Sequence, residues 1–485
     1  MKLEELIANI DCERVNFKNV DVTGLSYNSK TTKKGDIFIC LVGEYTDGHK
    51  YIQSAQENGA VALFTERQVD SDLPQIIVKS TRHQIADIAD KFYNSPSKEL
   101  NLIGVTGTNG KTTVTHLIQK IFESVNQKCA LIGTLGYKLS SEDTYKEAKH
   151  TTPQAPELQR VLRQIKTENK IDNVAMEVSS HSLEQRRVGN CDFKGAVITN
   201  LTQDHLDYHI TMDNYFDAKA ILFKNLKEGN FAVLNADDAY AERFKNVVPK
   251  GVRVLTYGIK NQADVMAKDI KFTGDGAQFI LKTKDEEFAV SLHMNGVFSV
   301  YNVLAALTTA KSQGFDIKMA AKALENVKGV AGRFEIVHKN PIVIVDYAHT
   351  PDGLENVLKA GREITQKGAN LICLFGCGGD RDATKRPKMG EIAEKLADKI
   401  VVTSDNPRSE NPEQIIFDIM AGIKSVDTDK VIVESDRGKA IELLKNISNE
   451  RDVIIIAGKG HEDYQILKDK TIHFDDREQA KKVFG

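Results

Sequence analysis

A glycine-bounded loop rich in threonine connects an apolar run to an amphipathic segment. The apolar run covers 102–105, the loop covers 106–113, and Leu117, Ile118, Ile121, Phe122 and Val125 follow at helical spacing. This order predicts a strand, a tight turn and a helix whose first turn begins at the loop. The side chains in the loop that could do chemistry are Lys111 and the two threonines after it.

Such a loop is suited to binding phosphate. Glycines at 107 and 110 allow several backbone N–H groups to converge, and the helix N-terminus adds a partial positive charge. Lys111 would bridge the β- and γ-phosphates, and the Thr112 hydroxyl would hold magnesium. The strict motif has glycine where this chain has Val105, so a turn that binds nothing is the alternative. We expect a nucleoside triphosphate to bind here.

The region around this loop, about 99–330, alternates strands with helices, which predicts a mostly parallel sheet with helices on both faces. Ligands of such sheets gather at the carboxyl ends of the strands. The strand at 174–176 runs into Glu177, and the strand at 196–199 is followed by His205. A carboxylate and an imidazole after two strands would reach a metal beside the phosphates. Lys219 lies in a helical segment, where a lone lysine is usually solvated.

The flanking regions also follow α/β patterns. In 1–98, strands are expected at 36–42 and 61–64, a helix at 52–58 and a linker at 94–98. From 331 on, strands at 342–345, 371–375, 400–402 and 453–456 each run into a polar loop, which is typical of a doubly wound domain. The loop 376–381 lacks a helix-opening Lys-Ser/Thr pair, so a substrate or interdomain role is favoured over a second nucleotide site.

Composition limits the class of protein. A chain of 485 residues predicts about three domains, and the net charge of −3 provides no basic field for nucleic acid. The first residues are acidic and no apolar stretch is long enough to span a membrane, so we expect a cytoplasmic enzyme. The six cysteines are scattered, which favours buried free thiols over disulfides or zinc.

A series of short motifs resembles the Mur ligase family over nearly the whole chain. They are Asn28-Ser29-Lys30, Asp47-Gly48-His49, the loop 107–113, Thr151-Thr152-Pro153, the stretch 176–187, Asp204-His205-Leu206-Asp207, Lys219, Asp346-Tyr347-Ala348-His349 and Asp405-Asn406-Pro407-Arg408. The resemblance implies a three-domain α/β ligase. Its domains would be a small uridine-nucleotide-binding domain (1–98), a central P-loop-type ATP-binding domain (99–330) and a Rossmann-like amino-acid-binding domain (331–485).

The resemblance also implies a reaction and its residues. ATP would phosphorylate a carboxylate, and an amine would attack the acyl phosphate, with Mg²⁺ neutralising charge. The implied catalytic residues are Lys111, Glu177, His205 and Lys219, and the metal ligands are Thr112, Glu177, His205 and Lys219, with Lys219 carrying a carbamate made from carbon dioxide. The implied ATP contacts are Gly107, Thr108, Asn109, Gly110, Lys111, Thr112, Thr113, Asn302, Arg333 and Asp346. Those for the UDP-sugar dipeptide are Ser29, Thr151, Thr152, Ser179, Gln185 and Arg187, and those for the amino acid are Arg381, Asp405, Asn406, Pro407, Arg408, Gly458 and Glu462.

Arg408 indicates which amino acid is added. Meso-diaminopimelate carries a carboxylate that lysine lacks, and a guanidinium binds it in a two-pronged way while repelling a lysine ammonium group. We expect diaminopimelate to be the amino acid, and the resemblance implies that it is joined to the γ-carboxylate of UDP-N-acetylmuramoyl-L-alanyl-D-glutamate in peptidoglycan precursor synthesis. We expect a monomer whose partners are small molecules. The alternatives are a lysine-adding relative, a folylpolyglutamate-type ligase and a P-loop switch. His150 and Ser299 stand where the family has asparagine and are left out of the sites.

Overall fold

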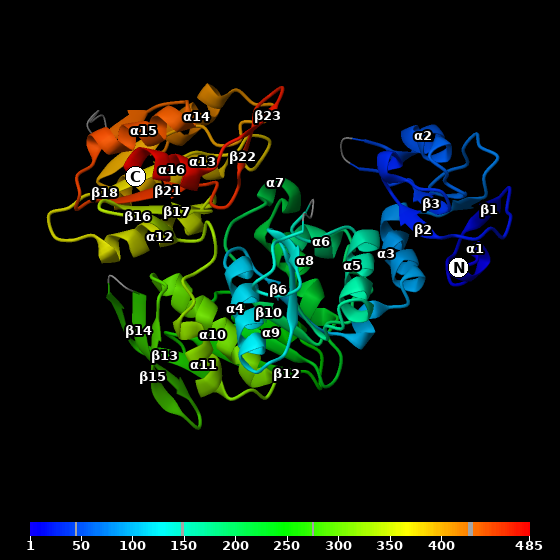
Figure 1. The fold of residues 1–485 in the computed structure, drawn as a ribbon, viewed down its shortest axis with the longest axis horizontal. Helices are drawn as coiled ribbons and strands as arrows, with labels where there is room; N and C mark the ends of the chain where they lie inside the picture. Colours follow the sequence, from blue (N-terminus) through cyan, green and yellow to red (C-terminus); the bar gives the residue numbers. More distant parts are fainter. Residues whose placement is uncertain (44–45, 147–149, 274–275, 425–429) are drawn as a thin grey trace. The chain divides into compact units, whose positions relative to one another are not determined.

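The computed structural model describes residues 1–43, 46–146, 150–273, 276–424 and 430–485 (Figure 1). Its backbone forms two compact units. The first unit contains 1–104, 127–196 and 221–230, and the second contains 105–126, 197–220 and 231–485. The domain boundaries expected at 98 and 330 stay predictions.

The first unit begins with a small sheet of order β1-β5-β4-β3-β2. Its strands are β1 (Glu13–Val15), β2 (Gly24–Ser26), β3 (Asp36–Ile39), β4 (Ala62–Thr65) and β5 (Gln75–Ile77), all parallel except β1. Its helices are α1 (Leu3–Leu6), α2 (Ile52–Glu57), α3 (Thr81–Phe92) and the 3-10 turns η1 (Ser29–Thr31) and η2 (Gly48–Tyr51). One apolar core packs α1 and α3 against the sheet, and a separate one packs α2. The expected strands and helix are confirmed.

Residues 94–98, expected as a linker, are held in place. They enter the 3-10 turn η3 (Pro96–Glu99), where Ser97 is buried. Arg163, on α5 (Ala155–Thr167), donates to the carbonyl oxygens of Tyr93 (3.0 Å) and Asn94 (2.8 Å) and pairs with Glu99. The guanidinium satisfies the carbonyls that a flexible linker would leave to water.

The remainder of the first unit contains β7 (Cys129–Gly133), β8 (Gly136–Lys138), β9 (Asn173–Glu177) and α6 (Ser180–Glu184). Strand β7 pairs in parallel with β9 and antiparallel with β8. Three elements run across the boundary between the units in the sequence, namely β6 (Asn101–Thr106), β10 (Gly195–Ile198) and α8 (Met212–Lys224). The expected strands at 102–105, 174–176 and 196–199 correspond to β6, β9 and β10.

In the second unit, a parallel set of strands changes into an antiparallel one. Strands β11 (Phe231–Asn235), β12 (Arg253–Gly258) and β13 (Val265–Thr273) are parallel, whereas β14 (Gly276–Thr283) and β15 (Glu287–Leu292) continue antiparallel. The helices here are α4 (Lys111–Ser124), α7 (Leu206–His209), α9 (Ala241–Val247), α10 (Val297–Ser312) and α11 (Ile317–Glu325). The antiparallel strands were not expected. Their buried and exposed positions alternate, as in a sheet that is half covered.

The C-terminal sheet has the order β16-β17-β21-β18-β19-β20. Its strands are β16 (Glu335–Lys339), β17 (Ile342–Asp346), β18 (Leu371–Phe375), β19 (Lys399–Val402), β20 (Val431–Val433) and β21 (Val453–Ala457), and only β16 is antiparallel. One apolar core packs α12 (Pro351–Ile364), α13 (Lys385–Leu396) and α14 (Pro412–Met420), and another packs α15 (Arg437–Ile447) and α16 (Asp476–Phe484). The hairpin β22 (Tyr464–Ile466) and β23 (Thr471–His473) follows β21. The predicted doubly wound arrangement is confirmed.

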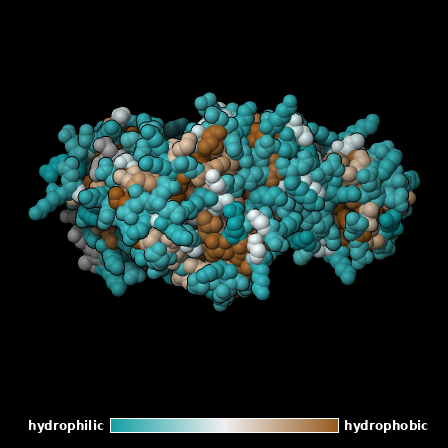
Figure 2. Space-filling model, turned by 90° about the horizontal axis from the view of Figure 1, so that it is seen from below, coloured by the Kyte–Doolittle hydropathy of each residue, from teal (hydrophilic) through white to brown (hydrophobic). Residues whose placement is uncertain are grey.

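Hydrophilic residues predominate on the face drawn in Figure 2, with smaller hydrophobic areas between them. Among the described residues, no helix is both long and apolar enough to cross a membrane. All six cysteines are free, and four of them are buried.

Candidate active site

The loop 107–110 has the backbone that its glycines predict. Gly107 and Gly110 have φ values of +141° and +87°, which residues with a side chain rarely adopt. A Cβ atom at Gly107 would overlap the Thr199 hydroxyl, and one at Gly110 would overlap the Asn302 amide. Helix α4 begins at Lys111, so its first N–H groups face the loop as expected. The positive φ values and the packing against Thr199 and Asn302 therefore both require glycine at these two positions.

Two lysines converge on one carbonyl oxygen of this loop. Lys111 Nζ donates to the carbonyl oxygens of Gly107 (2.9 Å) and Thr108 (2.8 Å), and Lys219 Nζ donates to the same Gly107 oxygen (2.9 Å). Lys219 is buried and lies 4.5 Å from the centre of the Tyr215 ring. Burial, and secondly the charge of Lys111, lower the pKa of Lys219 well below its usual value. Lys219 is thus a buried amine biased towards its neutral form, in place of the solvated lysine that a helix position suggests.

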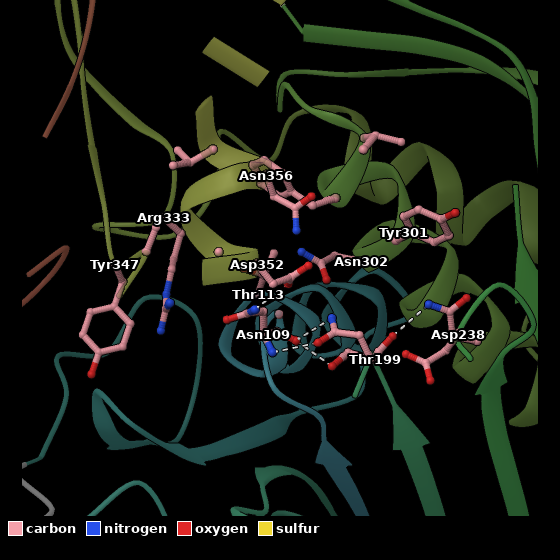
Figure 3. Close-up of a pocket in the computed structure, with 18 of the residues that line it drawn as sticks. Asn109, Thr113, Thr199, Asp238, Tyr301, Asn302, Arg333, Tyr347, Asp352 and Asn356 are labelled. Atoms are coloured by element: carbon pink, nitrogen blue, oxygen red, sulfur yellow. Dashed lines mark hydrogen bonds between the residues drawn. The ribbon is translucent and has the colours of Figure 1, made fainter. Parts of the chain in front are cut away.

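A cavity of about 260 Å³ opens beside the loop. Figure 3 shows Arg333 and Tyr347 at one end of it, Tyr301 and Asp238 at the other, and Asn109 and Asn302 between them. Its walls mix aromatic, amide and carboxylate groups, which is typical of a small-molecule site. Its lining includes six of the predicted ATP contacts, namely Asn109, Gly110, Thr113, Asn302, Arg333 and Asp346.

Arg333 connects the C-terminal segment to the phosphate loop. Its Nη2 donates to the Thr112 hydroxyl (3.3 Å), and its guanidinium lies 4.3 Å from the centre of the Tyr347 ring. Asp346 accepts the N–H groups of Phe334 and Ala348, each at 2.7 Å, and burial raises its pKa. Asp346 therefore ties together the backbone next to Arg333 and the backbone that follows β17.

Sequence reasoning assigned no role to Asp204 or His349. The Asp204 Oδ2 atom lies 3.3 Å from His205 Nε2 and 4.0 Å from His349 Nε2. Burial acts to raise the pKa of Asp204, but the two histidines and Lys385 outweigh it, so that pKa lies below its usual value. Burial, and then Lys385, lower the pKa of His349 to about 4. Asp204 lies in the motif 204–207 and His349 in the motif 346–349, but no local pattern in the sequence indicated that the two side chains would lie close together.

In the first unit, most of the predicted UDP-sugar residues come together around Glu177. Both carboxylate oxygens of this buried residue accept bonds from Thr134, at 3.0 Å each, and the Thr134 and Thr151 hydroxyl oxygens lie 3.2 Å apart. The Thr152 hydroxyl donates to the Glu177 carbonyl oxygen (2.9 Å) and accepts from the Ser179 N–H. Thr134 was not singled out from the sequence. Its position directly after β7 is the signal that could have identified it, because Glu177 ends the neighbouring parallel strand β9.

Two further predicted residues extend this cluster. The Arg187 guanidinium donates to the Thr152 carbonyl oxygen (3.0 Å) and, through Nε and Nη2, to the Gln185 side chain. Ser29 lies in η1 and is buried, and its carbonyl oxygen accepts from Asn58. Of the six predicted residues, five therefore form one connected set, and Ser29 lies in a different element, η1.

The predicted amino-acid residues gather at the carboxyl ends of β18, β19 and β21. Arg408 Nη1 donates to the carbonyl oxygens of Gly379 (2.8 Å) and Asn406 (3.4 Å). A Cβ atom at Gly458 would come within 2.5 Å of the Asp405 carboxylate. Asn406 Nδ2 donates to Glu462 Oε2 (2.9 Å). Arg381 is exposed, and its charge, after burial, lowers the pKa of Arg408. Two carboxylates and two guanidinium groups thus surround one site.

The predicted metal ligands are divided between the units. Glu177 belongs to the first unit, whereas Thr112, His205 and Lys219 belong to the second. Within the described ranges, no group of three or more His, Cys, Asp or Glu side chains is arranged to hold a metal ion. Because the predicted set also uses threonine and lysine, it stays a prediction.

Three family descriptions match the chain. Residues 21–93 match the Mur ligase family catalytic domain, 105–310 match the Mur ligase middle domain, and 332–460 match the Mur ligase glutamate ligase domain. These segments include strands β2 to β5 of the first sheet, the phosphate loop with its cavity, and the predicted amino-acid residues up to Gly458.

Proteins named UDP-N-acetylmuramoyl-L-alanyl-D-glutamate--2,6-diaminopimelate ligase are similar to the chain over its full length. The protein of that name from Syntrophomonas wolfei is 45% identical over 99% of this chain and 98% of its own. The one from Halalkalibacterium halodurans is 47% identical over 95% and 93%. A solved structure described by the same name is 33% identical, with a TM-score of 0.68 over 100% of this chain and 98% of its own.

Proposed function

The chain belongs to the Mur ligase family, and we propose that it joins meso-diaminopimelate to UDP-N-acetylmuramoyl-L-alanyl-D-glutamate with hydrolysis of ATP to ADP and phosphate. The observation that carries this proposal is the identity of 45% over 99% of the chain with a ligase of that name. The grouping of Arg381, Arg408 and Glu462 around one site supports the choice of a substrate with two carboxylates and two amines.

The reaction needs two anions to meet. The D-glutamate γ-carboxylate attacks the γ-phosphorus of ATP, ADP leaves, and an acyl phosphate forms. The diaminopimelate amine then attacks the acyl carbon, phosphate leaves, and the amine loses a proton to give the amide. Lys111, the converging N–H groups of the loop and Arg333 supply positive charge to the triphosphate, which lowers the barrier to the first step.

Lys219 serves this reaction as a carbamate. A neutral amine is required to take up carbon dioxide, giving an anionic carbamate and a proton, and burial holds Lys219 towards that neutral form. As an ammonium group it would repel a cation, so it fits magnesium only after carbamylation. The Thr112 hydroxyl offers the oxygen donor that magnesium prefers. We propose Thr112, His205 and carbamylated Lys219 as ligands in the second unit, and Glu177 stays a ligand predicted from the sequence.

Magnesium would supply charge neutralisation of the phosphates when bound. In the first unit, five side chains are proposed to bind the UDP-sugar dipeptide, because a guanidinium and several hydroxyl groups suit its acidic peptide end: Thr151, Thr152, Ser179, Gln185 and Arg187. Ser29 is proposed for the same substrate on the sequence motif alone.

A coupled phosphate-release assay tests this function. The protein is supplied with ATP, magnesium and the UDP-sugar dipeptide, and meso-diaminopimelate, L-lysine and L-glutamate are offered in turn. We expect phosphate release and the tripeptide product with meso-diaminopimelate only. Equal efficiency with L-lysine would contradict the substrate, and phosphate release without any amide product would contradict ligation.

A further inference from the structure

A lysine with no role in the reaction described above is enclosed in the amino-acid site. Lys459 follows β21, its side chain is fully buried, and its Nζ donates to Asn406 Oδ1 (3.1 Å) and Glu462 Oε2 (3.4 Å). Asn406 Nδ2 donates to the same Glu462 oxygen (2.9 Å). The three side chains thus form a closed ring. A buried ammonium group is costly unless its partners compensate it, so this ring needs an explanation.

The ring connects two loops that are proposed to hold the amino acid. Asn406 belongs to the loop 405–408 and Glu462 to the loop 458–462. Asn406 Oδ1 also accepts the N–H of Ile466, and Gln465 donates to the Asp405 carbonyl oxygen at 2.7 Å. These two bonds hold the loop 405–408 against β22. In the loop 458–462, the Gly458 N–H donates to the Asp346 carbonyl oxygen (3.0 Å) and the Glu462 N–H to the Lys459 carbonyl oxygen (2.9 Å). Each loop is therefore also held by bonds that do not use the Lys459 side chain.

What Lys459 adds is charge beside Glu462. Burial, and then the Asp405 carboxylate, raise the pKa of Glu462, whereas Lys459 and Asn406 act to lower it. The other charged or titratable groups that act on Glu462 or are acted on by it are Tyr347, Tyr464, Arg408 and Arg437. Arg437 already pairs with Asp476, and Arg408 bonds the Gly379 carbonyl oxygen. Among the residues that the structure describes, Lys459 is the cation that bonds the Glu462 carboxylate directly.

We propose that Lys459 is a positioning residue for the amino-acid substrate: bonded to Asn406 and Glu462, it keeps the Glu462 carboxylate ionised and oriented to bind an ammonium group of diaminopimelate. The inference rests on the proposed function. It predicts that diaminopimelate binds weakly once Glu462 is protonated, because a neutral carboxyl group cannot pair with the substrate ammonium group.

The test is the pH dependence of KM for meso-diaminopimelate in the full-length protein, measured for the wild type, Lys459→Met and Lys468→Met. Lys468 is exposed in the β22–β23 turn, so its variant is the matched control. In the wild type, KM should rise as pH falls through the pKa of Glu462. In Lys459→Met that rise should begin at higher pH, and KM at neutral pH should increase at least about tenfold, as expected for losing a charge-assisted bond. KM for ATP should not change.

The outcomes separate the inference from the function on which it rests. If the wild type does not use meso-diaminopimelate, the proposed function fails. If the wild type uses it and Lys459→Met shows the wild-type pH profile of KM, the inference is wrong even if kcat falls. If Lys459→Met does not fold, Lys459→Arg is measured in its place. Because arginine keeps the positive charge, its pH profile of KM for diaminopimelate should match that of the wild type, and a profile shifted to higher pH would contradict the inference.

Discussion

Replacing Arg408 tests the basis of amino-acid selection. The guanidinium uses Nη1 for the carbonyl oxygens of Gly379 and Asn406. Among the described residues, its Nε and Nη2 atoms have no hydrogen-bond partner, so one edge of the fork is available for a substrate carboxylate. We predict that Arg408→Ala loses the preference for meso-diaminopimelate over L-lysine.

The size of the loss follows from the bonds available. Two charge-assisted hydrogen bonds from the free edge contribute roughly 1.5–3 kcal/mol each before their mutual overlap is discounted, so about 3 kcal/mol is expected. This corresponds to roughly a hundredfold loss of kcat/KM for diaminopimelate. L-Lysine loses no such bond and escapes repulsion by the guanidinium. Its kcat/KM should stay level or rise.

The assay measures kcat/KM for both amino acids by phosphate release in the wild type, Arg408→Ala and Arg408→Lys. Arg408→Lys is the matched control, because it keeps a cation and loses the two-pronged geometry. We expect it to recover only part of the preference. Equal losses for the two amino acids in Arg408→Ala would refute the reasoning, since they would indicate collapse of the loop and not loss of a carboxylate partner.

Three further predictions address the phosphate loop, the carbamate and a buried histidine. Lys111→Ala should abolish ligation while circular dichroism and the melting temperature stay near the wild type, because its ammonium group bonds carbonyl oxygens of the loop and a loop lysine neutralises phosphate charge; near-normal turnover would remove the ATP assignment. Lys219→Ala should be nearly inactive and partly restored by small carboxylic acids in the buffer, and full activity without them would contradict the carbamate. Burial, and then Arg333, lower the pKa of His461 to about 3, so its neutral form stabilises the fold above pH 6.5 and this contribution is lost as pH falls towards 3. Between pH 6.5 and 5 the free energy of unfolding in urea should fall by about 2 kcal/mol more in the wild type than in His461→Gln, and parallel curves would contradict this.

The sequence predicted most of the elements that carry the site. Strand β6 and helix α4 were predictable because apolar spacing and the glycine loop are local signals, and the strands before Glu177, Asp346 and Asp405 were predictable for the same reason. The antiparallel strands β14 and β15 were not, because half-exposed strands interrupt the alternation of strands and helices that indicated a parallel sheet.

Burial of charged side chains was the least predictable feature. A lysine on a helix or in a loop is ordinarily solvated, so neither the enclosure of Lys219 nor that of Lys459 could be inferred from composition. Asp204 and His349 are far apart in the sequence, and only the fold brings them to 4.0 Å. Contacts between residues far apart in the sequence depend on tertiary packing, which local sequence patterns do not predict.

The buried Arg437 has a consequence for handling the protein. It pairs with Asp476, the first residue of α16, and donates to the carbonyl oxygens of Ser404 (3.3 Å) and Ala457 (2.9 Å), the residues just before Asp405 and Gly458. Cutting the chain before α16 would leave this enclosed guanidinium without its carboxylate, a loss of about 3–5 kcal/mol, next to both amino-acid loops. Shortened forms made for crystallisation should therefore keep α16.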